Sequence, residues 1–384
     1  MIKVDKRKVS RLLILSTLTA VLASCNFMNE DMPECATDPN VFTRVKFLYD
    51  YNVKKTDLFT DHVGSVYLYI FDENGVFLER REHTREYTSD PGFEILLDST
   101  ELRPGSSYQL LALANGNHKG YDNSLNTPGF QKGEMIPGVS TINDYRLTLD
   151  VDGDGDVDIF SFSQRFEEEN IEQLDTVWTT LTPQYLDVPV VRAPFESIEQ
   201  FPDSIVDVTI PLMRITNHIT VHLAGSNFTM NTNPEDFHIL LRFPHGNGEI
   251  NITGETLGDR ELFYRSIRKT MEPQGLQTEA NYSATLKAEF NVSRLQDGDG
   301  ASLQVWNADG TKLLAELFNI SSLLAAGKDA YDDPWSNQEY LDREYEYELY
   351  IELDDTTTEN PKIYWVEVRI SVLGWAVRFQ DEKI

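Results

Sequence analysis

The sequence predicts an all-β protein made of two tandem β-sandwich domains, and three observations lead to this prediction. First, apolar and polar residues alternate in many short segments, which is the period of a strand with one buried face. Second, turn-forming pairs such as Asn-Gly and Pro-Gly separate these segments. Third, the chain has 384 residues with 40% hydrophobic content, a length that favours about two domains with apolar cores.

The strand pattern is clearest in two segments. Residues 65–71 are largely β-branched and aromatic, and Asn74-Gly75 follows before a second apolar run. Because Asn and Gly both tolerate positive φ, this stretch predicts a hairpin. In segment 215–223, Ile215, Ile219, Val221 and Leu223 share one face, which predicts a half-buried antiparallel strand. Further strands are expected at 108–114, 206–210, 345–353 and 364–372, with turns at 103–105, 115–117 and 307–310.

Few stretches have the period of a helix, and we expect helices only at 321–326 and within 166–174. Segment 190–204 has two prolines, several acidic residues and little periodicity. We therefore place the domain boundary there, which gives an N-terminal β-sandwich domain at 41–198 and a C-terminal one at 199–384.

The first 25 residues have the layout of a secretory signal peptide that ends at a cysteine. Basic residues precede a largely apolar run at 12–23, and Leu22-Ala23-Ser24-Cys25 closes it. An apolar run of about a dozen residues is shorter than the ~20 residues that a membrane helix needs. The pattern resembles the bacterial lipoprotein signal, in which cleavage falls between Ser24 and Cys25 and the Cys25 thiol is acylated, with palmitate for example.

We therefore expect residues 1–24 to be removed and residues 25–40 to be a lipidated tether at the outer membrane. Several acyl chains on one cysteine would bind firmly, because their binding free energy adds per methylene. The acidic residues Glu30 and Asp31 resemble the surface-export signal of Bacteroidetes lipoproteins, which favours the cell surface. The alternatives are an ordinary signal peptide with an accidental cysteine, or a membrane helix.

Charge and cysteine content limit the partners and the source of stability. The net charge of −30 argues against nucleic acid and anionic lipid surfaces as partners, since both would repel the chain. Once Cys25 is acylated, Cys35 is the one remaining cysteine, so no internal disulfide can form. Stability must then come from buried apolar surface. Cys35 could still pair between molecules.

A set of strand-and-turn segments resembles the FimB-type minor fimbrial anchor and accessory lipoproteins of Bacteroidales. The segments lie at 45–53, 57–59, 63–75, 102–105, 210–221, 340–344 and 370–377, in the order and spacing of that family. The resemblance implies two transthyretin-like, Greek-key β-sandwich domains and a role in fimbriae, with lipid on Cys25 at the base. The chain departs from the family at Leu113-Ala114-Asn115, where members often have Trp, and in its Asp-rich run.

The expected partners are other fimbrial subunits, through contacts between strand edges. An incomplete sandwich exposes unpaired edges, which accept an incoming strand. Segment 364–379 either closes its own second domain or contacts the next subunit, and its alternation fits both alternatives.

Calcium is the one cofactor that the sequence suggests, and the fold itself requires none. The carboxylates occupy alternate positions, with glycine between them, as at the start of a calcium loop; they are Asp150, Asp152, Asp154, Asp156 and Asp158. The twelfth position is Ser161, where such loops carry a bidentate Glu. The alternative is an acidic, solvated hairpin tip.

Other polar clusters favour structure over chemistry. His218 and His222 would lie about 13 Å apart on one strand face, too far to share a zinc ion. Asp297-Gly298-Asp299-Gly300 favours a turn over a metal site. Alternating Glu and Tyr at 344–352 fits a sheet with one wet face better than a sugar-binding surface.

The sequence lacks the common catalytic motifs. The leading hypothesis is a non-enzymatic, lipid-anchored fimbrial subunit that anchors or terminates a fimbria and supports adhesion. The alternative is a surface lipoprotein that binds glycans on a β-sandwich. A glycosidase is a third hypothesis, but acidic residues without a motif give it little support.

Overall fold

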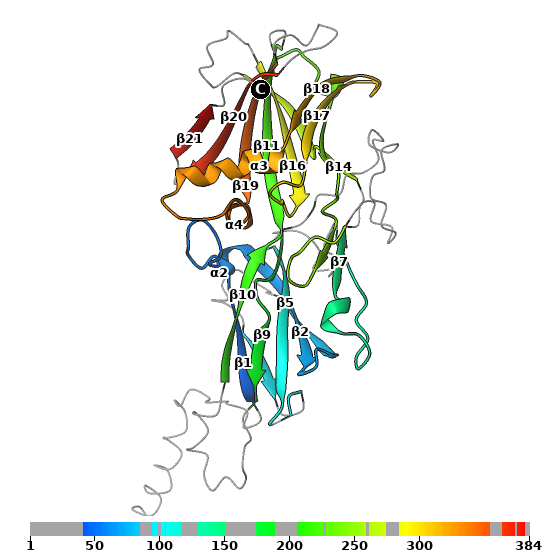
Figure 1. Ribbon diagram of the computed structural model, residues 1–384, viewed down its shortest axis with the longest axis vertical. Helices are drawn as coiled ribbons and strands as arrows, with labels where there is room; N and C mark the ends of the chain where they lie inside the picture. The colour runs from blue at the N-terminus through cyan, green and yellow to red at the C-terminus, as the bar shows by residue number, and fades with distance from the viewer. Residues whose placement is uncertain are drawn as a thin grey trace, which may run out of the picture. The chain divides into compact units, whose positions relative to one another are not determined.

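The structure is a computed structural model, and it describes residues 41–84, 94–98, 101–103, 105–116, 130–149, 174, 176–188, 206–225, 228–258, 261–273, 284–353, 363–372 and 375–380. Strands dominate this part of the chain and helices are few and short, so the predicted all-β fold is confirmed. Figure 1 shows two successive groups of strands, each packed as a β-sandwich.

The first sandwich is formed by a continuous path of paired strands in the order β3-β2-β5-β8-β10-β1-β4, with β9 also paired to β5. Strand β10 joins the two layers, because its last residues pair antiparallel with β8 and its first residues pair parallel with β1. The strands are β1 (Val41–Leu48), β2 (Val63–Asp72), β3 (Phe77–Thr84), β4 (Ile95–Asp98), β5 (Ser107–Gly116), β8 (Val177–Thr180), β9 (Gln184–Asp187) and β10 (Val206–Arg214).

Strand β2 is buried on both faces from Val66 to Phe71, which explains why this part of its sequence is a continuous run of aliphatic and aromatic residues. Val66, Leu68 and Ile70 pack into the core between the two layers. Tyr67 and Tyr69 point the other way and belong to a second core. A strand covered on both sides reads as a continuous apolar run, because neither face meets water.

The outer face of β2 is covered by segment 133–149, which we name the strap. Tyr145 and Leu147 of the strap are buried in the same core as Tyr67 and Tyr69. Thr141 and Asp144 form a capping box around the short helix η1 (Ile142–Asp144), which fixes the local path of the strap. Three short strands pair in the order β13-β7-β6; they are β6 (Phe130–Lys132), β7 (Arg146–Leu149) and β13 (Glu249–Asn251).

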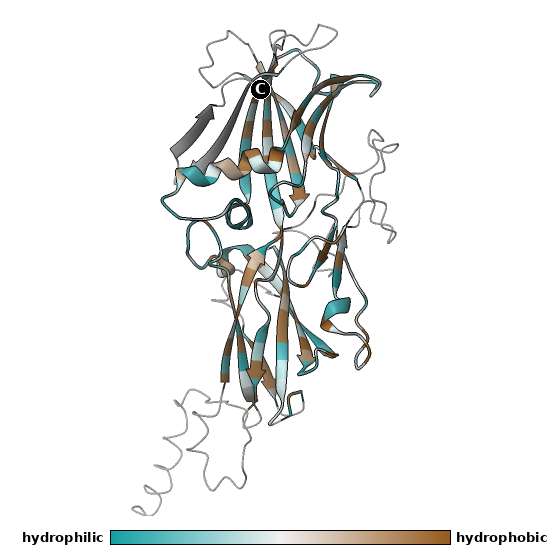
Figure 2. Ribbon diagram, in the orientation of Figure 1, coloured by the Kyte–Doolittle hydropathy of each residue, from teal (hydrophilic) through white to brown (hydrophobic). Residues whose placement is uncertain are grey.

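The second sandwich packs a six-stranded sheet, in the order β15-β16-β11-β19-β20-β21, on a four-stranded sheet, in the order β14-β12-β17-β18. Brown and teal residues alternate along many of its strands (Figure 2). The strands are β11 (Thr216–Gly225), β12 (Phe237–Phe243), β14 (Leu262–Arg265), β15 (Arg268–Pro273), β16 (Ala284–Ser293), β17 (Ser302–Asn307), β18 (Leu313–Phe318), β19 (Glu346–Leu353), β20 (Ile363–Val372) and β21 (Trp375–Gln380).

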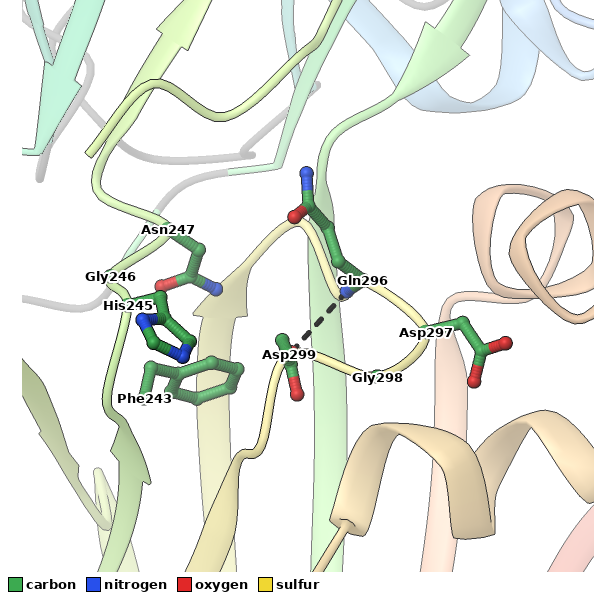
Figure 3. Close-up of a pocket in the computed structure, with 8 residues that line it drawn as sticks. All are labelled: Phe243, His245, Gly246, Asn247, Gln296, Asp297, Gly298 and Asp299. Carbon is green, nitrogen blue, oxygen red and sulfur yellow. Dashed lines mark hydrogen bonds between the residues drawn. The ribbon is translucent and has the colours of Figure 1, made fainter. Parts of the chain in front are cut away.

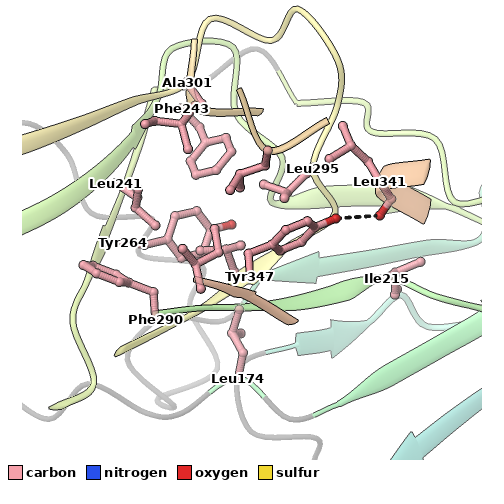
Figure 4. Close-up of a cluster of buried hydrophobic side chains, with 14 of the residues drawn as sticks. Leu174, Ile215, Leu241, Phe243, Tyr264, Phe290, Leu295, Ala301, Leu341 and Tyr347 are labelled. Atoms are coloured by element: carbon pink, nitrogen blue, oxygen red, sulfur yellow. Dashed lines mark hydrogen bonds between the residues drawn. The ribbon is translucent and has the colours of Figure 1, made fainter. Parts of the chain in front are cut away.

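Large side chains from both sheets fill the core of the second sandwich. Figure 4 shows Leu241, Phe243 and Tyr264 of the smaller sheet near Phe290 and Tyr347 of the larger one. All of these are buried, and rings of this size supply much of the apolar area removed from water.

Several predictions at the level of single residues are confirmed. Asn74-Gly75 ends β2 in a hairpin, and Gly75 has a φ of +77°, the left-handed conformation that glycine tolerates best. The apolar face of β11 is fully buried. The helix predicted at 321–326 is α3 (Ile320–Ala325). The helix predicted within 166–174 falls almost wholly outside the described residues. The remaining helices in the described part of the chain are α2 (Phe59–His62), α4 (Asn337–Arg343), η4 (Pro234–Asp236) and η5 (Ala326–Ala330).

The domain boundary at 198/199 stays a prediction. Strand β10 lies beyond it in the sequence, yet pairs with β1 and β8 of the first sandwich. Residues Phe42–Ile384 form one compact unit.

A cation held by aromatic rings joins the end of β10 to the start of β19. The guanidinium carbon of Arg214 lies 4.1 Å from the ring centre of Tyr345 and 5.9 Å from that of Trp178. Its Nε donates to the carbonyl of Thr216 over 2.8 Å. Burial lowers the pKa of Arg214. The two sandwiches are thus linked by cation–π contacts, and no carboxylate among the described residues forms an ion pair with Arg214.

His62 packs edge-on against Tyr345, with 6.1 Å between ring centres. Burial, and then the charge of Arg214, lower the pKa of His62, while Asp61 and Glu346 oppose the shift and Lys54 adds to it. The unfolded chain therefore takes up a proton on His62 more readily than the folded one does. We expect stability to fall as the pH drops below ~6.5, the ordinary imidazole pKa.

Urea unfolding above and below this pH would measure the effect, with His62→Phe as the comparison. Carboxylates also titrate in this range, so the difference between wild type and variant isolates the imidazole. Equal pH dependence in the two proteins would contradict the prediction.

Candidate functional site: the open edges of the second sandwich

The predicted lipid and calcium sites lie outside the described residues. These are Ser24, Cys25, Asp150, Asp152, Asp154, Asp156 and Asp158, and their roles stay predictions. Within the described part of the chain, no helix is long and apolar enough to cross a membrane. The same residues contain no cluster of three His, Cys, Asp or Glu side chains suited to a metal ion.

His218 and His222 are separate residues on the outer face of β11. Nδ1 of His218 lies 2.8 Å from Oδ1 of Asn291. His222 stacks on Tyr350, with 4.2 Å between ring centres and 4° between ring planes. Each ring therefore contacts a residue of a different neighbouring strand.

The Asp297–Gly300 segment is a turn, as predicted, with positive φ at Gly298 and Gly300. Asp299 accepts hydrogen bonds from Ser321 Oγ over 2.7 Å and from the N–H of Ala301 over 2.8 Å. Asp297 accepts from Ser322 Oγ over 2.9 Å. The two carboxylates thus hold the turn against the first residues of α3.

Strand β19 has one solvent-exposed face, as the alternation of Glu and Tyr predicts. Tyr347 and Leu349 are buried, whereas Glu346 and Glu348 are exposed. Glu344 lies just before the strand and is buried instead, and its carboxylate accepts hydrogen bonds from the N–H groups of Tyr345 and Glu346. Burial raises the pKa of Glu344.

Two sheet edges carry features that oppose pairing with another chain. Strand β3, at the end of the first sheet, contains the run Glu79-Arg80-Arg81-Glu82, and Arg81 forms an ion pair with Glu101. Strand β15, at one edge of the six-stranded sheet, contains Arg268, Lys269 and Glu272 and ends at Pro273. Charges and proline on an edge strand make the addition of a further strand unfavourable.

In the second sandwich, two other edge strands of the same length as β15 lack this protection. Strand β18 ends the four-stranded sheet, and Glu316 is its one charged residue. Phe318, at its end, is 59% exposed. Strand β21 ends the six-stranded sheet, and Arg378 is its one charged residue.

The two lightly charged edges lie on the same side of the second sandwich. Strand β18 contacts β20, the neighbour of β21, whereas the short edge strand β14 contacts β16, the neighbour of β15. Strands β15 and β14 therefore lie on one side of the second sandwich, and β18 and β21 lie on the other.

The C-terminal segment pairs with its own sheet. Strand β20 pairs antiparallel with β19, and β21 pairs antiparallel with β20. Residues 364–379 therefore close the second domain with strands of their own chain, and their contact with the next subunit stays a prediction. The sequence analysis did not predict strand β18 or its position at a sheet edge. The largely apolar run Leu313–Phe318, after the predicted turn at 307–310, could have indicated a strand there.

Comparison with known proteins agrees with this architecture. A profile of the fimbrillin-A associated anchor proteins Mfa1 and Mfa2 matches residues 32–381. A search of curated proteins finds no match. Solved structures share the fold.

The fimbrial anchor protein Mfa2 from Porphyromonas gingivalis has 14% identity and a TM-score of 0.56, covering 88% of this chain and 98% of its own. A candidate polysaccharide-binding protein from Bacteroides thetaiotaomicron VPI-5482 has 22% identity and a TM-score of 0.61, covering 88% and 98%. A candidate adhesin from the same organism has 19% identity and a TM-score of 0.62, covering 91% and 99%.

These identities are low, so the solved structures show a shared fold and no more. The profile match extends over most of the chain and confirms the family resemblance predicted from its strands and turns. This chain belongs to the family of fimbrillin-A associated anchor proteins Mfa1 and Mfa2.

Proposed function

We propose that this chain is a non-enzymatic fimbrial subunit, held at the outer membrane by lipid on Cys25, that anchors or terminates a fimbria at the cell surface and supports adhesion. The observation that carries the proposal is the match of residues 32–381 to a family of anchor proteins. Cys25 supports it, because it ends a signal-like segment and precedes that match.

The tether at 25–40 sets how far the first strand can lie from the lipid. A fully extended chain spans at most ~3.3–3.6 Å per residue, so sixteen residues reach about 55 Å. A tether of this length would allow the sandwiches to stand clear of the membrane surface, where other fimbrial subunits could reach them. The acidic chain also avoids adhering to anionic lipid.

Contact with the next subunit would use the side of the second sandwich that carries β18 and β21. Main-chain hydrogen bonds to an added strand supply affinity, and side chains at alternate positions supply specificity. The scarcity of charge on these two strands favours this side over the side with β15.

We expect Cys25→Ser to remove the protein from the membrane fraction and to release fimbriae into the medium. Serine lacks the thiol that is acylated. Radioactive palmitate labelling, cell fractionation and counts of fimbriae on cells and in the medium would measure these effects. A wild-type protein that takes up no label and fractionates as a free species would refute lipid anchoring.

Phe318→Lys tests the contact side without touching the core. Phe318 is exposed, so the variant should fold normally but attach fewer fimbriae, because a charge now stands on the edge that receives the partner. Met230→Lys is the matched control, since Met230 is also exposed, at 51%, and lies on the connection between β11 and β12. Equal fimbrial retention in both variants would rule out the β18 edge as the contact.

Glycan binding remains the second candidate function. One neighbour of similar fold is a candidate polysaccharide-binding protein, which prompts this hypothesis, although a shared fold does not assign a ligand. It is compatible with a fimbrial role, because adhesion to a surface can use saccharides.

A further inference from the structure

A solvent-open cavity of about 210 Å³ lies in the second sandwich, between two turns. One wall is the end of β12 and the turn that follows it, with Phe243, His245 and Asn247. The other is the turn after β16, with Gln296 and Asp299 (Figure 3). Pockets for drug-sized ligands begin at ~300 Å³, so this cavity suits something the size of one sugar ring.

Both walls are held rigid by hydrogen bonds behind the cavity. The amide of Asn247 donates to the carbonyls of Ser293 and Arg294 and accepts from the hydroxyl of Tyr264 over 2.6 Å. On the other wall, the Asp299 carboxylate is fixed by Ala301 and Ser321. A site that is already ordered loses little conformational entropy when a ligand binds.

Two polar side chains at the cavity make no hydrogen bond with any residue that the structure describes. They are the imidazole of His245, which is exposed, and the amide of Gln296, which is half-buried. Each offers both a donor and an acceptor. The Asp299 carboxylate adds acceptor capacity, because its two oxygens have more lone pairs than the bonds they now accept.

The lining restricts the class of ligand. Phe243 is the one apolar side chain, and it is only 2% exposed, so an apolar ligand would find little to contact. Asp297 and Asp299 form no ion pair with described residues, and their charge would repel an anion. Figure 3 shows the Asp297 side chain pointing away from Asp299, so the two carboxylates do not converge on a cation.

We propose that this cavity binds a neutral polyhydroxy ligand, a single saccharide residue, through His245, Gln296 and Asp299. Hydroxyl groups both donate and accept, which matches a lining that mixes an imidazole, an amide and a carboxylate. This inference rests on the second candidate function, glycan binding, and gives it a place in the fold; it does not depend on lipid anchoring or on fimbrial contact.

Saturation-transfer difference NMR on the purified chain from residue 26 onward would test the proposal. The probes are neutral hexoses and N-acetylhexosamines, with sialic acid as the anionic comparison. We expect signals from a neutral sugar and none from sialic acid. Titration should give a Kd for Gln296→Ala about three- to tenfold above the wild type, as the loss of one or two hydrogen bonds predicts. His245→Ala should have a similar effect.

Asn231→Ala is the matched control, because Asn231 is an exposed amide on the connection between β11 and β12. It should bind sugar as the wild type does, and thermal unfolding should show that all variants are folded. Failure to bind any neutral sugar would overturn the proposal, and so would binding that persists unchanged in both cavity variants. Either failure leaves the fimbrial proposal intact, since that rests on separate residues.

Discussion

Replacing Trp178 with alanine is expected to lower the free energy of unfolding by about 3–5 kcal/mol. Trp178 is fully buried in the core of the first sandwich and is the largest buried side chain there. Its ring packs edge-on against Tyr49, with 5.6 Å between ring centres, and also faces Arg214. The substitution therefore opens a cavity and removes one of the two rings around the half-buried guanidinium of Arg214.

Equilibrium unfolding in guanidinium chloride would measure the loss. Tyr185→Ala is the control, because Tyr185 is 73% exposed on β9 and its removal should change stability by less than ~0.5 kcal/mol. A loss below ~1 kcal/mol for Trp178→Ala would mean that the core closes around the missing ring, contrary to its tight packing.

Replacing Arg294 with alanine is expected to cost about 3–5 kcal/mol, the usual loss when one partner of a buried ion pair is removed. Arg294 binds Asp342 through two parallel hydrogen bonds of 2.7 Å each, from Nε and from one terminal nitrogen. The side chains are only 12% and 7% exposed. Without the guanidinium, Asp342 remains as a charge that is buried and unpaired.

A double replacement separates two contributions to the free energy of unfolding. One is the net contribution of the ion pair, and the other is the penalty for leaving one buried charge unpaired. Arg294→Met combined with Asp342→Leu should be much less destabilising than Arg294→Ala, because no charge is left behind. The surface pair Lys269–Glu235 is the control, since Glu235 is 65% exposed and its loss should cost ~1 kcal/mol or less. Equal losses for the single and double variants would contradict the argument.

Much of the local structure followed from residue patterns. The hairpin at Asn74-Gly75, the buried face of β11 and helix α3 were all predicted, because each depends on neighbours in the chain. The run at 65–71 was predicted as a strand. Its double burial was not, because the strap that covers it comes from residues 133–149.

The candidate site was only partly predictable. The family followed from the sequence, since it is recorded in the order of strands and turns. Acylation of Cys25 stays a prediction, which rests on a linear signal segment. The unprotected edges at β18 and β21 could not be predicted. A strand is an edge only when no further strand pairs with its outer side, and the sequence does not show which strands pair. The cavity at His245 and Gln296 was also not predictable, because these two residues are 51 positions apart in the sequence.

By itself, the sequence determined the all-β class, the turns, the alternation of the strands and the family. Tertiary structure decided which strands became neighbours. It placed β10 with β1, paired the C-terminal segment with its own sheet, and set the two lightly charged edges on one side. The physical reason is that hydrophobic periodicity fixes which face of a strand is buried, whereas pairing order depends on contacts between distant segments.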